Sequence, residues 1–147
     1  MGFKLGKNKV KKITYNYFPK DRDELKNILR ERLAKDKNAD LNDIDVSKIT
    51  DMMYLFFRLD PHNIDISEWD VSNVKYMQYM FDGCEKFNCD LSDWDVSNVE
   101  NISLMFSKCE SFEGKGLENW DVSNVKDMSW MFYKCNSIKT IPSWYAS

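Results

Sequence analysis

Histidine, glycine and long apolar runs are scarce in this chain, and each scarcity excludes a class of function. The 147 residues include one histidine, His62, and five scattered glycines. A Ser-His-Asp triad would have to use His62, and the sequence has neither a G-x-S-x-G elbow nor a glycine-rich phosphate loop. No apolar run approaches the roughly 18 residues that a membrane span needs. We therefore expect no enzyme, with no catalytic residues, no cofactor and no membrane span.

The N-terminal segment also lacks the features of an export signal. The opening MGFKLGKNKVKK is basic and has no apolar stretch of the secretory type. The chain as given is therefore predicted to be cytoplasmic, unless a leader was removed.

Residues 1–35 carry 11 Lys and Arg against 4 Asp and Glu, whereas residues 36–147 carry 10 Lys and Arg against 20 Asp and Glu. This asymmetry either steers a charged partner or is a solvated surface with no such role.

The four cysteines do not have the spacing of a disulfide or metal framework. Cys84, Cys109 and Cys135 each follow a tryptophan by 15 residues, so they are one position of a repeat. Such a row of small buried residues would stay as thiols in a reducing compartment. Cys89 lies outside the row, and no second Cys or His pair completes a zinc site. We expect no metal.

What the chain does have is a repeated hexapeptide. WDVSNV occurs at 69–74, 94–99 and 120–125, IDVSKI occupies 44–49, and Trp144 begins a fifth copy. A step of this size indicates a structural unit that is stacked on copies of itself. The fifth copy is incomplete after Trp144. Either Trp144 and Tyr145 fold back over the last unit, or that end of the stack binds another molecule. The second alternative includes self-association of the chain.

Each unit has two parts with different periodicity. VSNVENISLMFSKC has apolar residues at offsets 0, 3, 6, 7 and 10 counted from Val99, which is typical of an α- or 3₁₀-helix; they are Val99, Ile102, Met105, Phe106 and Cys109. FNCDLSDW alternates like a short strand, as do its equivalents NIDISEW (63–69) and DLNDI (40–44). The sequence therefore predicts an α/β solenoid, a leucine-rich-repeat-like right-handed coil of about four strand-plus-short-helix repeats over residues 40–147.

Residues 1–39 are predicted to form a strand and a capping helix that join the repeats in one continuous domain. Residues 10–18 alternate as a strand that ends at Pro19. A helix then begins at Asp21, with Glu24 in the capping-box place, and runs to about Lys35. One face carries the apolar side chains that would cover the first coil: Leu25, Ile28, Leu29 and Leu33.

An aspartate recurs in every copy of the motif. Asp45, Asp70, Asp95 and Asp121 would repel one another if stacked, so each is expected to accept backbone N–H groups within its own turn. A calcium site at Asp93, Asp95 and Ser97 is the alternative, but the glycine and distal glutamate of a calcium loop are missing.

The motif WDVSNVxxMxxMFxxC, preceded by FNxDLS, resembles the repeat of BspA-like leucine-rich-repeat proteins, which are common among bacterial surface proteins and mycoplasma lipoproteins. The resemblance covers residues 40–147, and the head from YFPKDRDELKN onward is similar to the segment that often precedes such arrays. It implies a leucine-rich-repeat-like solenoid used for binding and adhesion, without catalytic residues. It also allows a cell-surface location if a leader was removed.

Two surfaces are candidates for binding a partner. The first is an acidic strand face, whose outward residues are Asp65, Ser67, Asp90, Ser92 and Glu118. The second is an exposed aromatic row ten residues after each repeat start, formed by Tyr54, Tyr79, Leu104 and Trp130. Tyrosine and tryptophan are favoured anchors in interfaces. The row could instead pack between coils if the segments are not regular helices.

We therefore expect a non-enzymatic protein-binding module whose partner is another protein of unknown identity. An alternative is a small intracellular inhibitor, of the kind that phages carry, whose acidic face blocks a nucleic-acid-binding protein. Direct binding of nucleic acid by that face is disfavoured by its charge.

Overall fold

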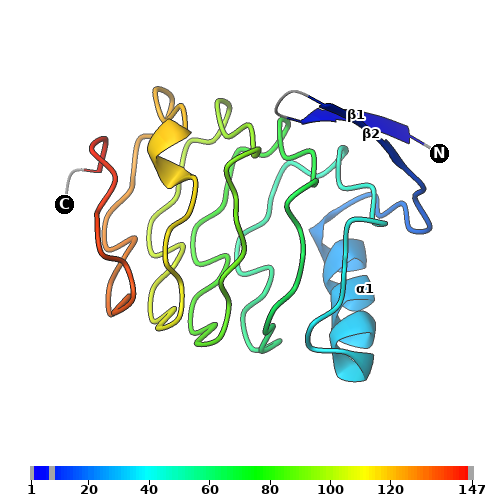
Figure 1. The fold of residues 1–147 in the computed structure, drawn as a ribbon, viewed down its shortest axis with the longest axis horizontal. Helices are drawn as coiled ribbons and strands as arrows, with labels where there is room; N and C mark the ends of the chain where they lie inside the picture. Colours follow the sequence, from blue (N-terminus) through cyan, green and yellow to red (C-terminus); the bar gives the residue numbers. More distant parts are fainter. Residues whose placement is uncertain (1, 7–8, 146–147) are drawn as a thin grey trace.

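The computed structural model describes residues 2–6 and 9–145, which form a row of loops closed at one end by a helix (Figure 1). Strands β1 (Gly2–Gly6) and β2 (Lys9–Ile13) pair as an antiparallel hairpin. Helix α1 (Arg22–Lys35) follows, and a short 3₁₀-helix, η1 (Leu117–Asn119), interrupts the loops. No helix among the described residues is long and apolar enough to cross a bilayer.

Helix α1 confirms the predicted cap and its boundaries. The carboxylate of Asp21 accepts the N–H of Glu24 at 2.9 Å, and the carboxylate of Glu24 accepts the N–H of Lys20 at 2.6 Å. The Asp21 cap satisfies one backbone donor that a helix start leaves without a partner. Glu24 reaches the N–H of the residue before the N-cap rather than that of Asp21, so the predicted capping box is only half formed. The predicted apolar face is turned to the core, with Leu25, Leu29 and Leu33 buried and Ile28 packed against them.

The predicted opening strand over 10–18 is only partly present. β2 ends at Ile13, and its partner is β1 rather than the loops. Beyond Ile13 the described contact of strand type is a single parallel bridge from Tyr17 to Ile44. The chain therefore leaves the hairpin before it reaches the first loop.

The prediction of an α/β solenoid is wrong. In the described part of the chain beyond α1 there is no β-strand, and the one helical segment is η1. The predicted strands at 40–44 and 63–69 are irregular, as is the predicted helix after Ser97. Parallel pairing between successive segments is reduced to isolated bridges such as that of Asp40 with Asp65. The sequence repeats therefore do not form a leucine-rich-repeat-like coil of strand-plus-helix units.

The sequence repeats instead form irregular loops that lie side by side (Figure 1). We name them loop 1 (44–68), loop 2 (69–93), loop 3 (94–119) and loop 4 (120–143). In loop 3 the N–H of Met105 donates to the carbonyl of Ile102, and that of Cys109 donates to Phe106. Consecutive i→i+3 turns place apolar residues about three apart, as a 3₁₀-helix would, and this is why the spacing suggested a helix.

The N–H groups between these turns bond to the next loop. The N–H of Leu104 donates to the carbonyl of Ser129, and that of Phe106 donates to Met131. A helix would use these groups internally, whereas here they join one loop to another. Leu104 has φ 52°, a left-handed conformation that turns the chain back after each short step.

The tryptophan of the repeated hexapeptide ties neighbouring loops together. The indole Nε1 of Trp94 donates to the carbonyl of Ile66, near the end of loop 1, at 2.9 Å. Its ring stacks on Trp69 and Trp120, with centroids 6.4 and 6.5 Å away. Trp144 continues this row on Trp120 at 6.3 Å, and Tyr145 meets Phe132 edge-on at 5.1 Å. The two C-terminal aromatic residues thus fold back on loop 4.

The polar residues of the hexapeptide also have structural roles. The carboxylate of Asp95 accepts both the N–H and the hydroxyl of Ser97, at 3.0 and 2.6 Å. The side-chain amide of Asn98 donates to the carbonyl of Ser72 in the preceding loop at 2.7 Å. The N–H of the equivalent serine is held in the same way by the other three aspartates, Asp45, Asp70 and Asp121. The prediction that each aspartate acts within its own turn is confirmed.

Candidate functional site

The four residues of the aromatic row, Tyr54, Tyr79, Leu104 and Trp130, occupy the same position in successive loops. Their φ angles are 60°, 59°, 52° and 59°. Backbone bonds connect them loop by loop, because the N–H of Tyr54 donates to Gln78 and that of Tyr79 donates to Ser103. Tyr54 is 37% and Trp130 63% exposed, whereas Tyr79 and Leu104 are half-buried. The row is thus continuous, and its two ends are its most exposed members.

The rings of the row contact one another and two further aromatic residues. Tyr54 and Tyr79 stack face to face, with centroids 4.6 Å apart and planes at 6°. Phe57 packs edge-on against Tyr54, and Tyr133 packs edge-on against Trp130, each at 5.4 Å. Phe57 and Tyr133 extend the aromatic row sideways at its two ends, and we call the row together with these two residues the apolar strip.

Sequence reasoning missed Phe57 and Tyr133, although a weak signal exists. Both lie three residues after a member of the aromatic row, one turn further along their loops. The same position holds Asp82 in loop 2 and Ser107 in loop 3, so it has no constant residue type. Only the turn geometry shows that this position lies beside the row.

The backbone conformation at these positions is unusual for the residues that occupy it. The third residue of a turn with positive φ is normally glycine or asparagine, and a bulky side chain there costs about 1–3 kcal/mol. Stacking of Tyr54 on Tyr79 offsets part of this cost, since such a pair contributes about 0.5–1.5 kcal/mol. Trp130 has one edge-on neighbour among the described aromatic rings and remains mostly exposed. Folding alone therefore gives little reason for a tryptophan at this position.

The hydroxyl of Tyr54 remains a hydrogen-bond donor over a wide pH range. Desolvation by its surroundings, then the neighbouring Tyr79 hydroxyl and the Asp82 carboxylate, raise the pKa of Tyr54 above its ordinary value. The strip therefore presents a neutral phenol beside its apolar rings.

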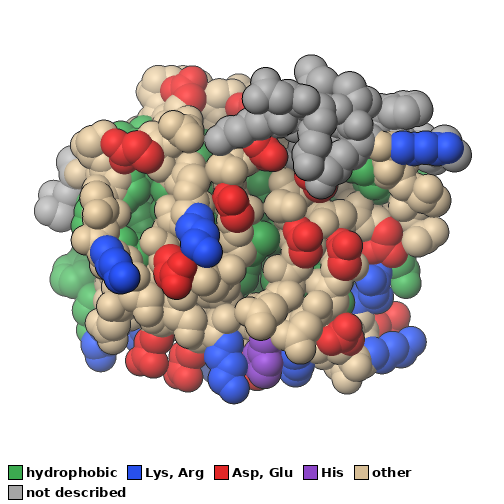
Figure 2. All heavy atoms as spheres, in the orientation of Figure 1, with side chains coloured by type: hydrophobic (Ala, Val, Ile, Leu, Met, Phe, Trp, Pro, Cys, Tyr) green, Lys and Arg blue, Asp and Glu red, His purple; other side chains and the backbone are tan. Residues whose placement is uncertain are grey.

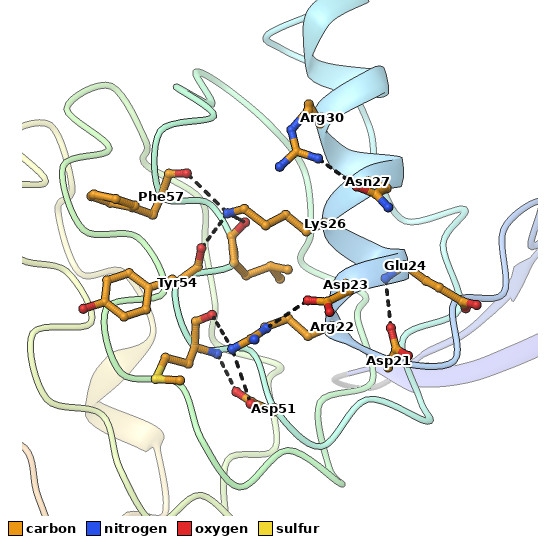
Figure 3. A network of polar contacts seen from close by, with 12 residues as sticks. Asp21, Arg22, Asp23, Glu24, Lys26, Asn27, Arg30, Asp51, Tyr54 and Phe57 are labelled. Atoms are coloured by element: carbon orange, nitrogen blue, oxygen red, sulfur yellow. Dashed lines mark hydrogen bonds and ion pairs between the residues drawn. The ribbon is translucent and has the colours of Figure 1, made fainter.

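Helix α1 closes the loop 1 end of this strip with cationic side chains (Figure 3). The ammonium of Lys26 donates to the carbonyls of Tyr54, Leu55 and Phe57 at 2.7, 3.0 and 3.3 Å. Arg22 reaches the carbonyl of Met53 at 3.5 Å. In loops 2 to 4 the carbonyls equivalent to those of Met53 and Leu55 accept N–H groups from the preceding loop. Lys26 and Arg22 therefore supply to loop 1 the hydrogen-bond donors that a preceding loop supplies elsewhere in the stack.

The residues predicted as an acidic strand face lie on irregular loops and on η1. Asp65 accepts the N–H and hydroxyl of Ser67 at 3.0 and 2.7 Å, and Asp90 accepts the N–H of Ser92 at 2.9 Å. These carboxylates therefore shape local turns, and Asp65 and Asp90 are also exposed. The face is not a strand, and whether it binds a partner stays a prediction.

Glu118, the fifth residue of that face, is separated from the aspartate turns because it belongs to η1. Its carboxylate accepts the hydroxyl and N–H of Ser143 at 2.6 and 2.8 Å, and these bonds lower the pKa of Glu118. Glu118 thus fastens the C-terminal segment to loop 3.

An acidic hollow lies beside β2. It has a volume of about 470 Å³, and its lining includes Lys12, Asp40, Asp65 and Glu68. Asp43 also lines it and pairs with Arg32 at 2.9 Å. Figure 2 shows carboxylate side chains spread across the visible face rather than gathered at one point. This distribution suits a broad contact with a basic surface better than a compact ligand site.

The cysteine row is structural. The thiol of Cys109 donates to the carbonyl of Phe81 in the preceding loop at 2.9 Å, and burial raises the pKa of this thiol. Burial likewise raises the pKa of Cys89 and of Cys135 to about 11. A thiol that stays protonated at neutral pH is a poor nucleophile.

Comparison with known proteins places the chain in a family. Neither the curated proteins nor the solved structures include a significant match. A family model described as "Mycoplasma protein of unknown function, DUF285" matches residues 24–144, which include most of α1 and all four loops. The chain therefore belongs to the DUF285 family of Mycoplasma proteins of unknown function.

Proposed function

We propose that the chain is a non-enzymatic protein-binding module that contacts its partner through the aromatic row. The observation that carries this proposal is Trp130, a bulky residue at φ 59° whose side chain is 63% exposed. A glycine or asparagine would form the same turn with less strain. An exposed tryptophan beside further aromatic residues is typical of an interface anchor.

The resemblance of the motif to BspA-like proteins supports a role in binding. We propose a relationship to that group and, with it, a function in recognition or adhesion rather than in chemistry. The residues that carry the resemblance, WDVSNV and the following Met-Phe and Cys positions, are occupied with loop stacking. Specificity would then come from positions that vary between loops, such as those of the aromatic row.

The test compares two equally exposed aromatic side chains. Trp130→Ala should abolish capture of the partner by the tagged chain, and Tyr133→Ala should weaken it. Phe18, which is also 63% exposed but lies before α1, provides the matched control, because Phe18→Ala should leave capture intact. All three variants should melt like the wild type. Equal capture by Trp130→Ala and wild type would contradict the proposal.

The acidic loops favour a second candidate, an inhibitor that covers a nucleic-acid-binding protein. Among the described residues Asp90 and Asp95 have no lysine or arginine within ion-pair distance, and both are exposed. A basic protein surface would complement them. Capture that falls steeply with salt and survives Trp130→Ala would favour this candidate over the first.

A further inference from the structure

Cationic side chains recur at one position beside the aromatic row, four residues further along each loop. Arg58 occupies this position in loop 1, Lys108 in loop 3 and Lys134 in loop 4, and Gly83 occupies it in loop 2. Their φ angles are 65°, 60°, 56° and 77° in that order, so the backbone has the same left-handed conformation in all four loops. We call Arg58, Lys108 and Lys134 the cation row.

The cation row and the apolar strip form one surface. The guanidinium carbon of Arg58 lies 5.2 Å from the ring centroid of Phe57, and the ammonium of Lys134 lies 5.3 Å from that of Tyr133. Phe57 and Tyr133 are the two rings that widen the strip. The rings of the strip are therefore bordered by positive charge at both of its ends.

The charges of the cation row are not neutralised within the part of the chain that the structure describes. No carboxylate of the described residues lies within ion-pair distance of Arg58, Lys108 or Lys134, and all three side chains are exposed. A methyl group added to Gly83 would meet no atom within 4 Å beyond its chain neighbours, so the surface is open in loop 2 as well. The row thus presents its positive charges to whatever covers the strip.

Helix α1 adds positive charge at the loop 1 end of the strip (Figure 3). Arg22, Lys26 and Arg30 follow one another at four-residue spacing, which places them on one face of the helix. Arg22 has the carboxylates of Asp23 and Asp51 within ion-pair distance. Lys26 instead donates to backbone carbonyls, and desolvation followed by the charges of Arg30 and Arg22 lowers its pKa. This end therefore has a positive potential that the described carboxylates do not balance at Lys26.

The strip also offers neutral hydrogen-bond donors. Four of the five tryptophans, Trp69, Trp94, Trp120 and Trp144, donate their indole N–H groups to backbone carbonyls. The indole N–H of Trp130 has no acceptor among residues 2–6 and 9–145. Carboxylates accept hydrogen bonds from indole N–H groups and, more strongly, from lysine and arginine. Apolar rings, a free donor and unpaired cations together complement a segment that carries both apolar side chains and carboxylates.

The charges beyond the cation row favour an acidic protein segment over a nucleic acid. Two residues further along the loops lie Asp60, Glu85 and Glu110, all exposed, and the whole chain has a net charge of -3. A polyphosphate chain carries a negative charge at every nucleotide, so it would be repelled by these carboxylates as well as attracted by the row. A protein segment places its carboxylates singly and can direct them to the cations alone.

We propose that the partner docks on the apolar strip with an acidic segment, whose apolar side chains cover the rings and whose carboxylates face the cation row. This inference rests on the proposed function and adds the chemical class of the partner. Loops joined by backbone hydrogen bonds lie about 5 Å apart, so the aromatic row spans about 15 Å. A segment of about five extended residues would cover it.

Three peptides of twelve residues probe this proposal. In the first, Glu alternates with Leu or Phe; the second has Gln and the third has Lys in place of every Glu. Dissociation constants come from NMR titration of the full chain, in which the indole N–H of Trp130 reports where the peptide binds. The Glu peptide should bind about tenfold more tightly than the Gln peptide, and the Lys peptide should bind most weakly. The net charge of -3 alone would give the opposite order.

A matched pair of variants separates the cation row from charge in general. Lys108→Gln/Lys134→Gln should weaken binding of the Glu peptide about fivefold and leave that of the Gln peptide unchanged. Lys115→Gln/Lys139→Gln removes one exposed lysine from each of the same two loops and should bind the Glu peptide like the wild type. Trp130→Ala should weaken binding of both peptides, because both use the apolar contact.

The outcomes distinguish this inference from the proposed function on which it rests. Equal binding of the Glu and Gln peptides, both weakened by Trp130→Ala, would overturn the inference and leave the proposed function standing. Glu-peptide binding that Trp130→Ala leaves unchanged would overturn both. Tighter binding of the Lys peptide, or no binding of the Glu peptide at about 1 mM, would also overturn the inference. So would tighter binding of a twelve-nucleotide oligothymidylate, in favour of nucleic acid.

Discussion

At the residue scale, several side chains serve both their own loop and its neighbour. Trp94 fills the interior of loop 3, and its indole N–H also satisfies the carbonyl of Ile66 near the end of loop 1. Cys109 does the same with its thiol, and Asn98 with its amide. Because every loop needs the same inward contact, the same residue types recur at the same step.

Removal of one such side chain should unfold much of the stack. Trp94→Ala leaves a cavity between Trp69 and Trp120 and removes the donor to the Ile66 carbonyl. We expect a loss of about 3–5 kcal/mol in the free energy of unfolding, measured by urea titration. Trp130→Ala, which removes an exposed indole, should cost less than about 1 kcal/mol. Similar losses in the two variants would mean that the buried tryptophan row does not stabilise the stack.

The buried thiols make stability sensitive to alkaline pH. Burial raises the pKa of Cys89 and Cys135 from 9.0 to about 11, so between these values the unfolded chain loses thiol protons that the folded chain keeps. The stability that depends on neutral thiols is complete below pH 9.0 and declines as pH rises toward about 11. Unfolding free energies measured across this range should fall less steeply for Cys135→Ala than for wild type. Parallel pH profiles would refute this cause.

At the element scale, α1 is the part that sequence reasoning described best. Its N-cap and buried leucines depend on local spacing, which a single sequence displays. The loops were misread because consecutive turns repeat apolar residues with nearly the period of a helix. The left-handed conformation at Tyr79 and Trp130 could not be foreseen either, since the usual signals for it are glycine and asparagine.

The contribution of α1 to stability should depend on Lys26 more than on the other basic residues of the helix. Lys26→Met keeps the length and helix propensity but removes the donor to three loop 1 carbonyls. We expect a loss of about 1.5–3 kcal/mol, the range for hydrogen bonds to a charged group. Arg30→Met is the matched control on the same helix, because exposed Arg30 contacts only Asn27 among the described hydrogen-bond partners. Thermal melting of both variants tests the difference, and equal melting temperatures would argue against the capping role.

At the scale of the whole molecule, the stack has two unlike ends and two unlike kinds of surface. The loop 1 end is covered by α1 and its cations, whereas loop 4 carries N–H groups without acceptors among the described residues. The aromatic row runs along the stack from Tyr54 to Trp130, and the acidic turns occupy other segments of each loop. The sequence placed the four residues of the aromatic row at one repeat position, but the strand and helix assigned to the two surfaces were wrong, and Glu118 lies apart from the acidic turns.

The most direct test of the central claim is site-specific photo-crosslinking in the source cells. A photoreactive phenylalanine placed at position 130 should crosslink a defined partner protein, and the same group at position 18 should not. Tyr133→Ala in the same chain should reduce the crosslinked product. A partner captured equally from both positions, or from neither while the chain is folded, would contradict a binding role for the aromatic row.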